Sequence, residues 1–84
     1  MRLTASSRFL RKAKKLREPG ASMLRAALRR FAADPQDPLL RTHKLKGDLD
    51  AYWAFSVDGD LRVLFRWDGD DAFLVNLGSH DRVH

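Results

Sequence analysis

Cysteine is absent from this 84-residue chain, which excludes disulfide bonds and thiolate metal sites as supports for the fold. A run of about 18 apolar residues, the length of a membrane-spanning helix, is also absent. The charged N-terminus lacks the apolar stretch of roughly 7 to 15 residues that a secretion signal needs. We therefore expect a soluble, cytoplasmic protein that does not act at a membrane.

Acidic side chains are scarce in the first half of the chain. Residues 1–46 contain 13 Lys or Arg against Glu18, Asp34 and Asp37, a balance of +10, whereas residues 47–84 contain three against eight acidic residues, a balance of −5. A field polarised in this way attracts phosphate backbones or an acidic partner over long distances. It also suits a protein that is merely well solvated, so charge alone leaves nucleic-acid binding open.

The length bounds the architecture. A chain of 84 residues forms one domain at most and buries only roughly 60 to 65% of the surface that it exposes when unfolded. Neither an internal repeat nor a low-complexity tract divides it. We therefore expect a single domain over residues 1–84, with a small core.

Two segments of the first half show helical periodicity. The first is predicted to run to about Arg17, with either Ser6 or Ser7 as its cap, because a serine oxygen accepts from an unpaired first-turn amide. The second is predicted over about residues 21–33, and Asp34-Pro35 stops it. Their apolar stripes are formed by Phe9, Leu10, Ala13 and Leu16, and by Leu24, Ala27, Leu28 and Phe31. So short a turn makes the two helices antiparallel, and residues 34–40 are expected to be a loop.

The second half has the composition of strands. Residues 52–57, 61–67 and 72–79 are rich in aromatic and aliphatic side chains, and Asp58-Gly59 and Asp68-Gly69 separate them. Asp-Gly between strands is a strong hairpin signal. The pattern predicts an α+β fold: a small twisted antiparallel sheet, made of a three-stranded meander and a possible short strand within residues 1–5, with two antiparallel helices packed on one face.

Alternation along the strands sorts their side chains between two faces. The face toward the helices is expected to carry Trp53, Phe55, Val57, Leu61, Val63, Phe65, Trp67, Phe73, Val75 and Leu77. The other face is expected to carry Ala54, Ser56, Arg62, Leu64, Arg66, Leu74, Asn76 and His80. The aromatic residues could instead stack on bases, but their parity with the aliphatic residues favours a core. A face as polar as the second is either solvated or a binding surface.

The three histidines, His43, His80 and His84, flank the strands, and Arg62 lies on the strand between them. Metal-free RNA cleavage needs a base for the 2′-hydroxyl proton, a cation for the phosphorane and an acid for the 5′-oxygen. Histidine serves either proton role near neutrality, and arginine suits the anion. The histidines lack the i, i+4 spacing of a zinc site, so we expect neither a metal nor any other cofactor.

Three stretches carry a resemblance to a known family. RTHKLKGDLDAYWAF (41–55), DLRVLFRW (60–67) and LVNLGSHDRVH (74–84) resemble the RelE/ParE superfamily of bacterial type II toxins, and within it the YafQ-like and YoeB-like messenger RNA interferases. The resemblance implies a RelE-like fold, cleavage of messenger RNA at the ribosome and silencing by a cognate antitoxin protein. It leaves two alternatives, a ParE-like toxin that inhibits DNA gyrase by binding and a non-catalytic remnant of the fold.

The resemblance also implies roles for individual residues. His43 matches the position of a general base, Arg62 the arginine beside the scissile phosphate, and His80 the histidine that acts on the leaving group. Asp60 coincides with an aspartate implicated in the YafQ-like group, and His84 occupies the final family position. Contacts with the RNA backbone are expected from Lys44, Lys46, Arg66 and Arg82.

Each of these residues also has a simpler interpretation. His43 could be a solvated loop residue, Arg62 a surface partner of an acidic side chain across the sheet, and Asp60 a turn residue that bonds locally. His80 could bond to a carbonyl at a strand end, and His84 could belong to a frayed terminus. The nuclease hypothesis predicts 2′,3′-cyclic phosphate and 5′-hydroxyl products and no cleavage of DNA, which lacks the nucleophile.

Overall fold

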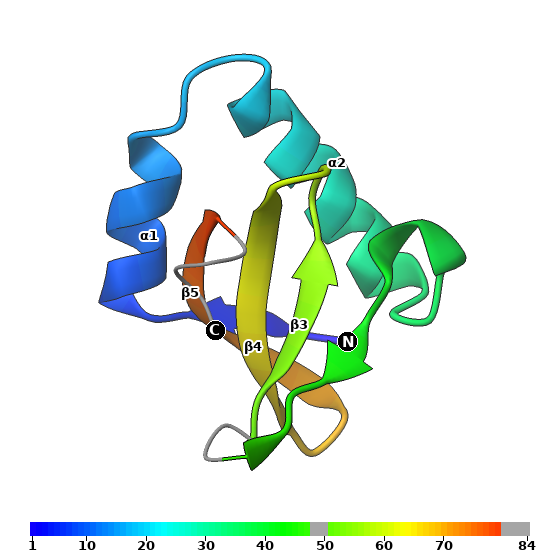
Figure 1. Ribbon diagram of the computed structural model, residues 1–84. Coiled ribbons are helices and arrows are strands. Elements are labelled where there is room, and N and C mark those ends of the chain that lie inside the picture. Colours follow the sequence, from blue (N-terminus) through cyan, green and yellow to red (C-terminus); the bar gives the residue numbers. More distant parts are fainter. Residues whose placement is uncertain (48–50, 80–84) are drawn as a thin grey trace.

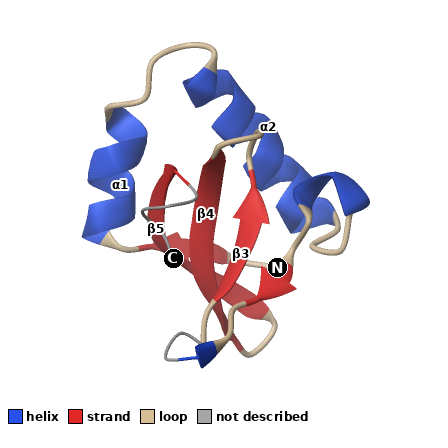
Figure 2. Cartoon of the chain, in the orientation of Figure 1, coloured by secondary structure: helices blue, strands red, loops and turns tan. Residues whose placement is uncertain are grey.

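The computed structural model describes residues 1–47 and 51–79, so His80, Arg82 and His84 lie outside the described residues. In chain order the elements are β1 (Leu3–Ala5), α1 (Ser7–Lys14), α2 (Gly20–Ala33), the 3₁₀ helix η1 (Pro38–Leu40), β2 (His43–Lys44), β3 (Trp53–Ser56), β4 (Leu61–Asp68) and β5 (Asp71–Ser79). The two helices run in opposite directions beside the sheet (Figures 1 and 2). Neither helix has the length and apolar character needed to cross a membrane.

The sheet has five strands in the order β1-β5-β4-β3-β2. Strands β3, β4 and β5 form the expected antiparallel meander, so the predicted α+β class is confirmed. Two details differ from the expectation. The short N-terminal strand β1 exists but pairs with β5 in parallel, which makes the sheet mixed. Strand β2 was not predicted, because two residues are too few to show a period.

Ser6 caps helix α1, and it is one of the two serines that the sequence allowed as the cap. The Ser6 hydroxyl oxygen accepts from the Phe9 N–H at 3.0 Å, and the hydroxyl donates to the Val75 carbonyl at 2.6 Å. The helix ends at Lys14, three residues before the predicted end. The N–H of residue 15 bonds the carbonyl of residue 12, and that of residue 16 bonds residue 13, so the last turn is tightened into 3₁₀ geometry.

The predicted apolar stripe of α1 is wrong at Leu10, because 52% of the surface of this residue is exposed. Phe9, Ala13 and Leu16 are spaced i, i+4 and i+7 and pack together against the core. Leu10 is one residue from Phe9 and therefore about 100° around the helix from it, outside that stripe.

Substitution of Ser6 is expected to be costly because one hydroxyl makes two bonds. We predict that Ser6→Ala lowers the free energy of unfolding by about 1 to 2 kcal/mol, through the lost cap and the lost bond to the Val75 carbonyl. Urea denaturation measures this, with Ser7→Ala as the matched control, since Ser7 is exposed and is the first residue inside the helix. Equal stabilities of the two variants would contradict the cap.

Helix α2 packs Leu24, Ala27 and Phe31 into the core, as predicted. Its cap residue, Pro19, has no side-chain cap bond. The carboxylate of Glu18 instead accepts from the Ser22 N–H at 2.8 Å. Hydrogen bonds from Ser22 and the nearby Arg25 hold the pKa of Glu18 below its ordinary value, so this contact is retained at neutral pH.

The centre of the core is aromatic. Phe31 of α2 is fully buried, and its ring stacks on Phe55 with a centroid distance of 4.5 Å and meets Phe65 edge-on at 4.8 Å. Trp53 and Trp67 are partly buried against the same cluster. These four aromatic residues of the sheet therefore belong to the core, as their parity indicates, and do not form a base-stacking platform.

A bulge in β5 overturns part of the predicted alternation. The register changes from Leu64↔Asn76 to Phe65↔Leu74, which leaves Val75 as the extra residue. Leu74 is consequently in the helix-side core, and Phe73 lies on the other face. Val75 also changes sides and packs with Leu64. Alternation cannot show a bulge, because it assumes unbroken pairing.

The face away from the helices is less polar than predicted. Leu45, Ala54 and Leu64 form a second buried cluster there, to which no helix contributes. Leu45 extends the β2–β3 pairing through a bond from its N–H to the Tyr52 carbonyl at 2.9 Å. We call this helix-free side of the sheet, with Leu45, Ala54 and Leu64, the open face.

The expected loop over residues 34–40 contains the 3₁₀ helix η1, whose Leu40 is buried in the main core.

Candidate active site

His43 and Arg62 lie on the open face. His43 pairs with Ala54, and Arg62 pairs with Ser56, and directly paired residues point to the same side of a sheet. Ala54 belongs to the open-face cluster, and Ser56 follows it by two residues. Two strand spacings and a two-residue offset separate the Cα atoms of His43 and Arg62 by roughly 12 Å. Their long side chains can thus approach one nucleotide from two sides.

Arg62 is a half-buried cation that forms no ion pair with a described residue. Its Nη1 donates to the Ser56 hydroxyl at 2.9 Å, while its buried Nε has no hydrogen-bond partner among the described residues. Ser56 and Gly78 are its neighbours across the sheet, so the alternative of a surface pair with an acidic residue is wrong. A buried charged donor that lacks an acceptor is costly, and an anion bound at this position would satisfy it.

Ser56 is a site residue that the sequence analysis missed. It is 9% exposed and touches the guanidinium of Arg62. Alternation placed Ser56 on the same face as Arg62, but the hairpin signal did not show that the two residues pair. A two-residue turn at Asp58-Gly59 would place Ser56 opposite Leu61, whereas the observed connection of residues 58–60 places it opposite Arg62.

The imidazole of His43 has a defined orientation. Its Nδ1 lies 2.9 Å from the backbone carbonyl oxygen of Arg41. Since a carbonyl only accepts, Nδ1 carries the proton, and the lone pair of the neutral ring is on Nε2. The residue lies on the edge strand β2 and not in a loop. Its side chain is nonetheless exposed, as a group that meets a substrate must be.

The structure brings only some of the residues predicted to bind RNA to the open face. Arg66 shares the open face, with its Cζ 5.0 Å from the ring centroid of Phe73. Lys44 pairs with Trp53 and so points to the opposite side from His43. Lys46 is exposed beyond β2.

Asp60 is exposed in the turn between β3 and β4. Its N–H donates to the carboxylate of Asp58 at 2.8 Å, and the N–H of Leu61 donates to the same oxygen. Asp58 therefore organises the turn, and within the described part of the chain the Asp60 carboxylate makes no hydrogen bond or ion pair.

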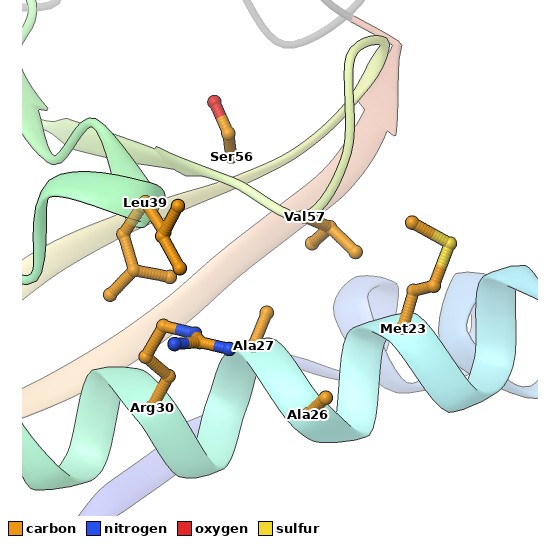
Figure 3. A pocket seen from close by; sticks show the side chains of 8 residues that line it. Met23, Ala26, Ala27, Arg30, Leu39, Ser56 and Val57 are labelled. Atoms are coloured by element: carbon orange, nitrogen blue, oxygen red, sulfur yellow. The ribbon is translucent and has the colours of Figure 1, made fainter.

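Two hollows adjoin this region. The larger, of about 300 Å³, lies between α2 and η1 and is mostly apolar. Figure 3 shows Val57 pointing into it and Ser56 pointing away from α2. Its cation, Arg30, is paired with Asp37 at 3.5 Å. The smaller hollow, of about 160 Å³, adjoins the site residues Ser56 and Arg62. Its other lining residues are Leu39, Arg41, Val57, Asp58 and Gly59. Across residues 1–47 and 51–79, no three His, Asp or Glu side chains are grouped as metal ligands.

Comparisons with known proteins bear on the sequence and on the fold. No protein-family model matches the chain. The endoribonuclease HigB of Proteus vulgaris is 31% identical over 42 residues, which cover 50% of this chain and 46% of HigB. The match thus spans about half the length of this curated relative.

Solved structures match nearly the whole chain. A YoeB/ParE toxin from Agrobacterium tumefaciens has a TM-score of 0.79 at 18% identity, covering 95% of this chain and 99% of that one. YafQ of Escherichia coli has a TM-score of 0.77 at 15% identity, covering 98% and 96%. YoeB in the YoeB-YefM toxin-antitoxin complex of Staphylococcus aureus has a TM-score of 0.76 at 14% identity, covering 95% and 97%. The chain therefore has the fold of RelE/ParE superfamily toxins, as the resemblance implied.

Proposed function

We propose that this protein is the toxin of a bacterial type II toxin-antitoxin system and that it cleaves messenger RNA without a metal ion. The observation that carries the proposal is the half-buried Arg62, whose Nε has no acceptor within residues 1–47 and 51–79, on the same open face as His43. The local likeness to endoribonuclease HigB and the shared fold of YafQ and YoeB support the same reaction.

In the proposed mechanism, Nε2 of His43 removes the proton from the 2′-hydroxyl of one nucleotide. The 2′-oxygen attacks the adjacent phosphorus and forms a phosphorane, and the Arg62 guanidinium stabilises its added negative charge. The P–O5′ bond then breaks, and the departing oxygen takes a proton from an acid. His80 is our candidate for that acid from the family resemblance. The products are a 2′,3′-cyclic phosphate and a 5′-hydroxyl.

The proposed site favours a ribosome-bound message over free RNA. His43 is exposed, and the hollow beside Arg62 is small. Such an open surface holds a flexible strand poorly, and positioning of the reacting atoms contributes a large part of catalysis. A ribosome that holds the message in place would supply that positioning.

The proposed partner that silences the toxin is an acidic antitoxin protein. Residues 1–17 contain seven Lys or Arg and no acidic residue, and most of those of α1 are exposed. Among described residues the ion pairs are Arg25–Glu18 and Arg30–Asp37, so the cations of α1 are available to a partner. Charge complementarity of this kind speeds association and selects partners.

The test uses purified protein, ribosomes and a defined messenger RNA. Cleavage is expected to give products that end in a 2′,3′-cyclic phosphate. Replacing the single 2′-hydroxyl at the mapped site with hydrogen should abolish cleavage there. A message that stays intact while gyrase is trapped on DNA in arrested cells would support the ParE-like alternative. An intact message with no growth arrest would support the remnant.

A further inference from the structure

We propose that Arg41 is a second phosphate-binding arginine, which holds the same RNA phosphodiester as Arg62. The inference deepens the nuclease function proposed above and rests on it for the identity of the ligand. Both residues line the hollow of about 160 Å³ at the end of β3. They come from different elements, Arg41 from the C-terminal end of η1 and Arg62 from β4.

The charges in this hollow favour an anion. Asp58 is its acidic residue, and Oδ1 of that carboxylate is engaged by the N–H groups of Asp60 and Leu61 at 2.8 and 2.6 Å. Neither arginine is ion-paired with a described residue. Two guanidinium groups and one carboxylate leave a net positive charge, and the buried Nε of Arg62 lacks an acceptor in the described part of the chain. A phosphate oxygen is such an acceptor, and its geometry suits the arginine fork.

The backbone of Arg41 connects this hollow to His43. Arg41 adopts a left-handed conformation with φ 51° and ψ 42°, which residues with a Cβ atom seldom adopt. Its N–H donates to the Pro38 carbonyl at 3.3 Å, and its own carbonyl accepts from His43 Nδ1 at 2.9 Å. The main chain of Arg41 therefore orients the imidazole, while its side chain lines the phosphate hollow.

The ligand class follows from these groups. Arginine side chains and a serine hydroxyl contact phosphate oxygens without reading bases. The described residues that line the hollow include no aromatic side chain on which a base could stack. We assign it one phosphodiester of a single-stranded RNA. Arg41 is exposed, so its contribution is to substrate binding and should depend on salt.

The test removes the guanidinium while keeping the backbone. Asparagine tolerates left-handed conformations, so Arg41→Asn retains the carbonyl that orients His43. The probe is a single-stranded RNA oligonucleotide with 2′-O-methyl groups, which the protein cannot cleave. Arg41→Asn is expected to weaken binding about tenfold and to reduce the slope of log affinity against log salt by about 0.7. Arg29→Asn is the matched control, because it removes the same charge from an exposed position on α2.

The outcomes separate this inference from the nuclease function. A larger loss for Arg41→Asn than for Arg29→Asn supports the inference, even if the protein cleaves nothing. Equal losses in the two variants overturn it, even if the wild-type protein cleaves messenger RNA, and so does a wild-type protein that fails to bind the oligonucleotide at low salt. Arg41→Lys should recover part of the salt slope, because lysine restores the charge without the fork.

Discussion

Arg62→Ala is expected to lower kcat for messenger RNA cleavage on ribosomes about 10²- to 10³-fold, the usual effect of removing one donor that stabilises a developing anion. The guanidinium is placed for this role by two features. Its Nη1 is held by Ser56 at 2.9 Å, and its Nε has no acceptor in the described structure. The phosphorane carries one more negative charge than the bound phosphodiester, so the contribution of this donor should be larger in the transition state than in the ground state.

Arg66→Ala is the matched comparison, because Arg66 lies four residues further along β4 on the same face. Its guanidinium is exposed and lies over Phe73, away from the smaller hollow. We expect this variant to raise KM a few-fold and to leave kcat unchanged. Equal kcat values for the two alanine variants would show that Arg62 contributes only its positive charge and that its position beside Ser56 has no catalytic effect.

A loss of activity in Arg62→Ala must also be separated from a loss of structure. The substitution leaves the Ser56 hydroxyl without the Nη1 donor of Arg62. It also removes the buried Nε donor, which has no acceptor among the described residues. The two effects oppose each other, so the thermal unfolding midpoint should change by only a few degrees. Arg62→Lys keeps a positive charge without the fork and should recover only part of the rate.

The sequence predicted the parts of this site that depend on local pattern. Strand alternation places Ser56 and Arg62 on the open face, as observed. Their direct pairing was not predictable, because it needs a three-residue connection where the Asp-Gly signal indicates a two-residue turn. Alternation failed at Phe73, Leu74 and Val75, because the extra residue Val75 breaks the regular pairing that alternation assumes.

The other elements of the site could not be predicted for different reasons. Strand β2 has two residues, so it becomes a strand only through pairing with β3. The orientation of His43 depends on a carbonyl oxygen of a left-handed residue, and residue type does not encode either property. His80, Arg82 and His84 lie outside the described residues, so their roles remain predictions from the resemblance.

Together these features explain how a small domain can hold two distant groups in register. Arg62 is fixed by the β3–β4 hairpin, which is anchored on the aromatic core through Phe55 and Phe65. His43 is fixed from the other side by η1, whose Leu40 is buried in that same core. Rigid elements position reacting groups more accurately than loops do, so the core itself contributes to the proposed chemistry.

His43→Asn is expected to lower kcat about 10²- to 10⁴-fold, the range that one general base contributes. The asparagine amide can donate to the Arg41 carbonyl as Nδ1 does, so the local structure and KM should be retained. The variant removes the lone pair that Nε2 supplies when Nδ1 is the donor. Lys44→Ala, on the next residue of β2 but on the other face, should leave kcat unchanged.

The division of the effect between kcat and KM distinguishes a base from a residue that only positions the substrate. Loss of a base should lower kcat and leave KM unchanged, whereas loss of a binding contact should raise KM. A raised KM with an unchanged kcat in His43→Asn would assign the proton transfer to another group and would leave His43 a positioning role only.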